Sequence, residues 1–186
     1  MAGSTPIASS IQFTYEDYLH FSDDKRYEII EGEVYMVPSP LTYHQKVSIR
    51  LERFVEDYVI ERDLGEIYHA PLDVVLSDID VVQPDILFIS NDNDGIITEK
   101  NIQGAPDLVI EILSPSSDHK DKVLKKKLYA KYGVKEYWLV DPGAKEIQVF
   151  TLKDAALTLW NAYRLDEIMQ SALWPELKLE LKSIFR

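Results

Sequence analysis

The sequence contains no cysteine among its 186 residues, which excludes disulfide bonds and thiolate sites for zinc or iron–sulfur clusters. It also lacks any apolar run near the roughly 18 residues that a membrane-spanning helix needs. Its seven glycines form neither a glycine-rich phosphate loop nor a nucleophile elbow. The segment MAGSTPIASS has neither the charged start nor the apolar stretch of a signal peptide. We therefore expect a cytoplasmic protein that does not enter a membrane.

Positive charge is also scarce, because 20 Lys and Arg residues stand against 32 Asp and Glu residues, for a formal net charge of −12. A surface that binds nucleic acid throughout needs Lys and Arg, so the composition argues against one. Lysines are nevertheless concentrated in the segment 119–135. This segment could be a local basic ridge that meets a polyanion, or an ordinary solvated helix face.

The length of 186 residues and the hydrophobic content of 46% suffice for one well-buried core. No linker-like stretch divides the sequence. We expect a flexible N-terminal segment at residues 1–13, followed by a single domain at residues 14–186.

Hydrophobic periodicity and turn residues predict a mixture of helices and strands. A short helix is expected at 14–20 with Thr14 as its cap, and a β-hairpin is expected to turn at Glu31-Gly32. Longer helices are expected at 41–62 and 117–132. Strands are expected at 66–76, 81–90, 107–114, 136–142, 146–152, 157–165 and 177–185. This order predicts an α/β (α+β) fold, in which helices flank a mixed central sheet and further strands lie near both termini.

Two carboxylates interrupt the apolar strands of the central part. Glu111 lies inside the apolar run 108–113, where an unpaired carboxylate costs several kcal/mol. Asp85 follows Pro84 and precedes the run ILFI. If the two strands are neighbours, the acids converge and could bind Mg²⁺ or Mn²⁺, since hard cations take oxygen ligands and need few from the protein. The alternatives are an ordinary strand-start acid at Asp85 and a Lys or Arg partner for Glu111.

Lys125 is the one lysine of the basic segment that should face the core. At about 100° per residue, it lies beside the apolar stripe that begins at Leu124, and Asp121 and Tyr129 fall on or next to the same stripe. A buried lysine needs a carboxylate partner or a function, and Glu111 would supply the partner if the helix packs over its strand. The alternative is a surface ion pair between Asp121 and Lys125, one helical turn apart.

Several segments taken together resemble a known family. YEIIEGEV, VVQPDILFI, VIEILSPSS, the spacing Asp121-xxx-Lys125-xxx-Tyr129 and YGVKEYWLVDP are similar to the Uma family of restriction-endonuclease-like proteins, which belongs to the PD-(D/E)XK nuclease superfamily. The resemblance covers roughly residues 14–185. It implies a restriction-endonuclease-like core and Mg²⁺-dependent hydrolysis of DNA phosphodiester bonds.

The resemblance also implies roles for particular residues. Asp85 matches the acid of the PD element and Glu111 the acid of the (D/E)XK element, so both, with a backbone carbonyl near Ile112, would hold the metal. The pattern asks for lysine at position 113, where this sequence has Leu113. Lys125 matches the following helix, to which the family's lysine is thought to have migrated. It would orient or activate the attacking water and offset charge in the transition state.

Three further positions carry weaker parallels. Glu28, in YEII, matches an acid that the superfamily often supplies from its N-terminal part, and it would ligate a second ion or position the first. His44 and Gln45 open the long helix, where related proteins often have a similar pair. His44 then either lines the site or is a satisfied histidine near the start of the helix. Tyr129 is expected to pack beside Lys125 rather than to take part in catalysis.

Two functions from different classes remain. The first is a metal-dependent endonuclease acting on DNA, expected by analogy to be a homodimer because cutting both strands of a duplex takes two sites. The second is a catalytically inactive nuclease-like fold that serves as a nucleic-acid or protein interaction module. Net acidity and Leu113 favour the second. The set of Asp85, Glu111 and Lys125 on core-facing positions favours the nuclease, which we prefer.

Overall fold

The structure is a computed structural model of the chain, and it describes residues 11–22, 25–114 and 119–186. In the last range the side chains are described from residue 123 onward. Residues 1–10, which make up most of the segment expected to be flexible, lie outside the described residues. Within these ranges no helix is long and apolar enough to cross a membrane.

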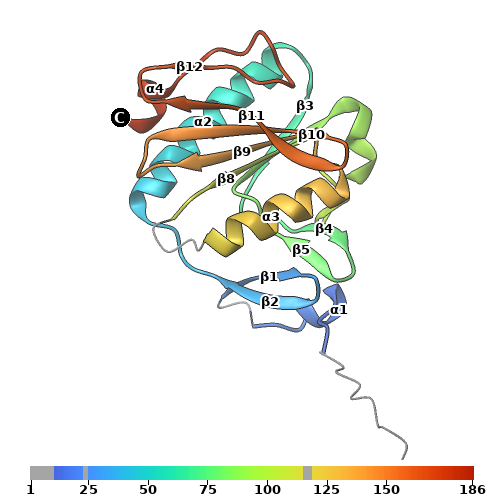
Figure 1. Cartoon of the computed structure of the whole chain (residues 1–186). Helices are drawn as coiled ribbons and strands as arrows, with labels where there is room; N and C mark the ends of the chain where they lie inside the picture. The colour runs from blue at the N-terminus through green and yellow to red at the C-terminus, as the bar shows by residue number, and fades with distance from the viewer. Residues whose placement is uncertain (1–10, 23–24, 115–118) are drawn as a thin grey trace, which may run out of the picture.

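A mixed six-stranded sheet forms the centre of the molecule (Figure 1). Its strand order is β11-β10-β9-β8-β6-β3, in which β8 and β9 run parallel and the other neighbours run antiparallel. The strands are β3 (Gly65–His69), β6 (Ile86–Ser90), β8 (Leu108–Ile112), β9 (Glu136–Asp141), β10 (Glu146–Lys153) and β11 (Ala156–Arg164).

A second sheet of five strands lies against one end of the first, in the order β2-β1-β5-β4-β7 (Figure 1). Its strands are β1 (Arg26–Ile30), β2 (Glu33–Val37), β4 (Val74–Ser77), β5 (Asp80–Val82) and β7 (Ile102–Gln103). The predicted hairpin is confirmed. Glu31 and Gly32 both have positive φ, 54° and 80°, as the tight turn between twisted strands requires.

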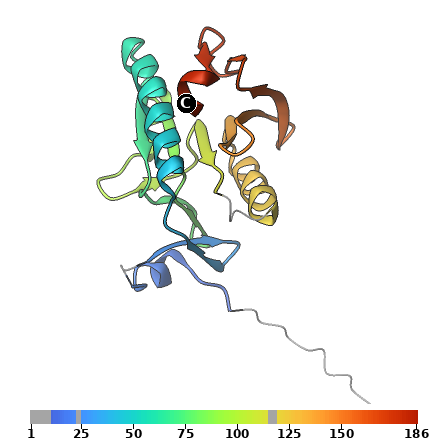
Figure 2. The same cartoon turned by 90° about the vertical axis from the view of Figure 1, so that its left-hand side faces the viewer.

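Two long helices cover opposite faces of the central sheet (Figure 2). The helices are α1 (Tyr15–Tyr18), α2 (Thr42–Glu61), η1 (a 3₁₀ helix, Asn91–Ile96), α3 (His119–Tyr132) and α4 (Leu181–Phe185). Successive strand residues point to opposite faces. Ile110 and Ile112 therefore join the core under α2, whereas Val109 joins the core under α3. Glu111 shares the α3 face with Val109, which is why a helix lysine can reach it.

The predicted fold class is confirmed, but three predicted strands are not single strands. The segments 66–76 and 81–90 each divide into two strands that belong to different sheets, β3 with β4 and β5 with β6. Pro71 and Pro84 lie at the breaks, since proline has no N–H to donate to a sheet. The predicted strand 177–185 is also wrong for most of its length. Its strand part is β13 (Leu179–Glu180), which pairs with β12 (Ile168–Met169), and α4 follows directly.

Candidate active site

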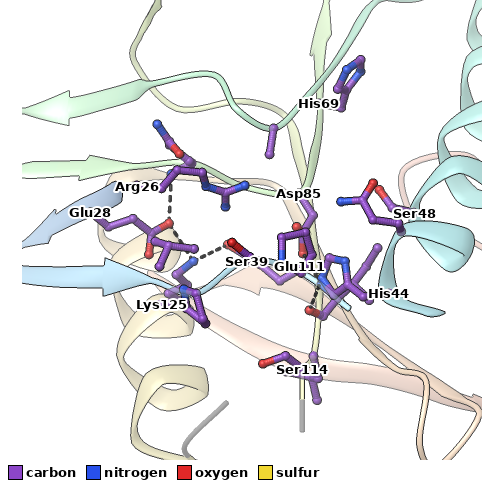
Figure 3. Close-up of a pocket in the computed structure, with 18 of the residues that line it drawn as sticks. Arg26, Glu28, Ser39, His44, Ser48, His69, Asp85, Glu111, Ser114 and Lys125 are labelled. Carbon is purple, nitrogen blue, oxygen red and sulfur yellow. Dashed lines mark hydrogen bonds and ion pairs between the residues drawn. The ribbon is translucent and has the colours of Figure 1, made fainter. Parts of the chain in front are cut away.

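Most of the predicted site residues line a cavity of about 590 Å³ between the β1–β2 hairpin, α2 and the end of β8 (Figure 3). Tyr129 is fully buried behind it and contacts Glu111. Asp85 immediately precedes β6, and Glu111 is the fourth residue of β8. The two strands are antiparallel neighbours, with Ile86 opposite Ile110. This register brings Asp85 and Glu111 to the same end of the two neighbouring strands. The two acids therefore lie close together, as the sequence analysis predicted for neighbouring strands.

Lys125 crosses from α3 to the central sheet and contacts two buried glutamates. Its Nζ lies 3.0 Å from Glu111 Oε1 and 2.9 Å from Glu28 Oε1 (Figure 3). Glu111 Oε1 also accepts a 2.6 Å hydrogen bond from the hydroxyl of Tyr129. The backbone N–H of Gln83 donates to Glu28 Oε1 at 2.9 Å. One ammonium therefore joins acids from two different sheets.

Asp85 and the main chain of β8 form a second group of contacts. Asp85 Oδ2 accepts a 2.8 Å hydrogen bond from the Ile112 N–H. His44, from the start of α2, places Nε2 3.3 Å from Asp85 Oδ2 and 3.0 Å from the Ile112 carbonyl oxygen. A single N–H thus faces two oxygen atoms at once. Asp85 and the Ile112 carbonyl are thereby held next to each other by the imidazole of His44.

The electrostatics of this cluster depend on burial. Burial raises the pKa of Glu111 to about 7, and the nearby carboxylates add to that rise, while Lys125 and the Tyr129 hydroxyl oppose it. Burial disfavours the charged form of Lys125, but Glu111 and Glu28 outweigh this and raise the lysine pKa. Burial would likewise lower the pKa of His44, but its bonds to Asp85 and to the main chain raise it. The lysine therefore remains positively charged between the two glutamates.

The donor set suits a hard divalent cation. Asp85 Oδ1 and Glu111 Oε2 make no hydrogen bond to another described residue, and the Ile112 carbonyl oxygen lies beside Asp85. Among the described residues, no group of three or more His, Cys, Asp or Glu side chains is arranged to hold a metal ion. The fit is thus to a cation such as Mg²⁺ that takes one or two carboxylates and keeps several waters.

The other predicted residues have different surroundings. Gln45 is an exposed residue that lines the cavity one position after His44. Leu113 also lines the cavity, at the position where the motif would have lysine. The side chain of Asp121 lies outside the described part of the chain, so its alternative pairing with Lys125 is not tested.

Sequence reasoning missed two cavity residues. Gln83 holds Glu28 through its backbone, and its side chain donates to Tyr18 and Asp73. No local pattern marks it. Arg26 lines the cavity two residues before Glu28 on β1. Residues i and i+2 of a strand share a face, so the hairpin prediction together with Glu28 could have identified it.

Comparison with solved structures shows to which fold class the chain belongs. The fold matches the crystal structure of "a putative nuclease belonging to DUF820 from Anabaena variabilis ATCC 29413" with a TM-score of 0.77. The match covers 93% of this chain and 97% of that chain at 21% sequence identity. The chain therefore has the restriction-endonuclease-like fold.

The family follows from the sequence match. Residues 14–182 match the model of the Uma2 family, described as "Putative restriction endonuclease", and this chain belongs to that family. The uncharacterized protein slr1290 of Synechocystis sp. is 26% identical over 188 residues, which cover 99% of this chain and 92% of that protein. The resemblance drawn from the sequence motifs is confirmed.

Proposed function

We propose that this protein is a metal-dependent endonuclease that hydrolyses DNA phosphodiester bonds with Mg²⁺ or Mn²⁺. Family and fold indicate a nuclease related to restriction endonucleases. The observation that carries the finer proposal is the Lys125 ammonium bound between two buried glutamates. Asp85 and the Ile112 carbonyl line the same cavity and are held together by His44. A mere scaffold has no need of this arrangement on core-facing positions.

Asp85, Glu111 and the Ile112 carbonyl would hold the cation. When bound, it would polarise a phosphate oxygen and lower the pKa of a coordinated water. Lys125 would donate to that water or to the phosphate and offset the charge that develops in the transition state. Tyr129 holds Glu111 in place through its 2.6 Å bond, which positions the ligand without touching the substrate. Glu28 keeps the ammonium directed at the cavity and could serve a second ion.

The second candidate is the catalytically inactive module, which Leu113 favours because the usual lysine position of the motif is apolar. Lys125 can replace the lysine missing at position 113, because its ammonium, on α3, donates to Glu111, the acid of the same motif. The nuclease proposal includes a homodimer, since two sites would be needed to cut both strands of a duplex. Sedimentation of the whole chain measures its oligomeric state.

The first test removes a metal ligand. Mn²⁺ binding is measured by calorimetry, and cleavage of supercoiled and branched DNA is measured with the same preparations. Glu111→Ala should abolish Mn²⁺ binding and slow cleavage at least about a hundredfold. Glu66→Ala, which alters an exposed glutamate on β3, should behave as the wild type. A wild-type protein that binds no divalent ion at millimolar concentration would contradict the nuclease proposal.

A further inference from the structure

Arg26 lines the candidate site, and its side chain has no ion-pair partner among the residues that the structure describes. Its side chain extends from β1 into the cavity (Figure 3), and its Nε atom is buried with no hydrogen-bond partner. No carboxylate of a described residue lies within ion-pair distance of the guanidinium, although Glu28 is only two residues away on the same strand face. The nearby glutamate is instead occupied by Lys125 and the Gln83 amide.

An unpaired guanidinium is costly in such a place. Arg26 as a whole is half-buried, but its buried Nε–H has lost hydration that only an anion or a hydrogen-bond acceptor can replace. The planar fork of the guanidinium matches two oxygens of one phosphate. The geometry therefore calls for an anion that enters from solvent, and a phosphate group has the matching shape.

Part of the cavity lining is apolar. Met36, on β2, and Ile49, on α2, are each 61% exposed and line the cavity. Pro38 and Pro40 continue this apolar wall, together with the ring of Tyr35. Such a surface suits the flat face of a base that is not stacked in a duplex. The volume of about 590 Å³ lies in the range of sites that enclose a small organic group.

The charges that line the cavity do not suit the outside of a duplex. In the part of the chain that the structure describes, two permanently charged cations line it, Arg26 and Lys125, against four carboxylates. The carboxylates are Glu28, Glu52, Asp85 and Glu111. Duplex binding draws on rows of Lys and Arg that follow both backbones. A single phosphate beside a single base needs only one such cation.

We propose that this cavity binds one unpaired nucleotide of a DNA single strand, with Arg26 on its phosphate and the wall of Met36 and Ile49 against its base. The inference rests on the proposed function, because the phosphodiester held here would be the one hydrolysed. An unpaired strand needs one site, so the inference does not depend on a dimer.

The test measures binding rather than turnover. Fluorescence anisotropy compares a labelled thymidine oligonucleotide of about 10 nucleotides with a blunt duplex of the same length, in Ca²⁺. Arg26→Gln should weaken single-strand binding about tenfold or more and reduce the slope of log K against log salt by about 0.7. Arg26→Lys keeps the charge without the fork and should fall between. Lys25→Gln, at the exposed neighbouring position, should change little.

A second pair of variants tests the wall. Ile49→Ser should weaken single-strand binding, whereas Ile60→Ser, an exposed position of the same helix outside the cavity, should not. The urea midpoint of Arg26→Gln should equal or exceed that of the wild type, because an unpaired charge is removed. A clear loss of stability would mean that Arg26 is structural and would overturn the inference.

The remaining outcomes separate the two proposals. Tighter binding of the duplex, or wild-type affinity in Arg26→Gln, overturns the inference even if duplex DNA is cleaved. Single-strand binding that depends on Arg26 supports the inference even if no DNA is cleaved, in which case the proposed function alone fails.

Discussion

Asp107 and Glu111 are both buried, 2% and 9% exposed, but their surroundings differ. Burial would raise the pKa of Asp107, but Lys135 and the Ser90 amide outweigh it and lower that pKa. Glu111 receives its hydrogen bonds from the side chains of Lys125 and Tyr129 alone among the described residues, and its pKa is raised to about 7. Both oxygens of Asp107 thus have a partner, Oδ1 the Lys135 ammonium in an ion pair and Oδ2 the Ser90 amide. Among the described residues Glu111 Oε2 has none, so Glu111 is the acid suited to bind a cation.

The different roles proposed for Glu111 and Lys125 predict different effects of replacing each of them on metal binding and on DNA cleavage. Lys125→Met should retain Mn²⁺ binding but slow DNA cleavage by about 10²- to 10³-fold, because the cation that offsets transition-state charge is gone. Calorimetry and cleavage assays measure the two quantities on one sample, with circular dichroism as a check of folding. Lys127→Met is the matched control, since Lys127 is exposed on the same helix. Equal cleavage by both variants would show that Lys125 has only a structural role.

At the scale of elements, the position of Asp85 depends on how β6 is held. β6 lies between β8 and β3, and β3 begins at Gly65, which pairs with Ser90. Gly65 has φ of 149°, and a Cβ there would lie 2.1 Å from the Ile89 carbonyl oxygen. Only glycine permits this close approach. The start of β3 is therefore a point at which a single methyl group would force two backbones apart.

Gly65→Ala should lower the free energy of unfolding by about 2 kcal/mol or more, from overpacking against main-chain atoms. Urea denaturation followed by circular dichroism measures it. Gly95→Ala is the control, because a Cβ at Gly95 meets no atom within 4 Å, and it should stay within about 0.5 kcal/mol of the wild type. If the two variants are equally stable, β3 is free to shift.

At the scale of the whole molecule, buried acids join separate parts of a chain with net charge −12. Asp80, on the small sheet, accepts hydrogen bonds from Tyr132 and Lys131 at the end of α3. Asp107, directly before β8, forms an ion pair with Lys135 and accepts a hydrogen bond from the N–H of Ser90, the last residue of β6. Burial opposes the charge on both acids, but these partners lower both pKa values below the usual value of 3.8.

A lowered folded-state pKa means that the stabilisation is fully present above the unfolded pKa, near 4, and is lost as pH falls through the folded pKa. Asp107→Asn should therefore be about 1–3 kcal/mol less stable than the wild type at pH 7. The difference should shrink as pH falls below about 4. Urea midpoints between pH 7 and pH 3 measure it, and the exposed Asp57→Asn provides the control. A difference independent of pH would show that the charge of Asp107 contributes nothing.

Much of the local structure was predictable from the sequence. Thr14 forms the predicted cap, with a reciprocal bond to Asp17, and Glu31-Gly32 forms the predicted turn. α2 spans 42–61 against a predicted 41–62, and α3 ends before Gly133, whose φ is 89°. These features depend on periodicity and turn chemistry within a few residues, so a single sequence contains them. Strand and helix positions also predicted that Asp85, Glu111 and Lys125 face a common region, whereas Glu28 was added only through the family resemblance.

The tertiary structure decided the rest. It assigned the halves of 66–76 and 81–90 to different sheets, and it turned 181–185 into a helix because Leu181, Ile184 and Phe185 are buried at helical spacing. It also brought Glu28 to Lys125 across 97 residues of sequence and left Arg26 with no ion-pair partner in the described part of the chain. The physical reason is the same in each case. Local pattern specifies which face of an element is apolar, whereas the partner of that face depends on contacts between distant segments.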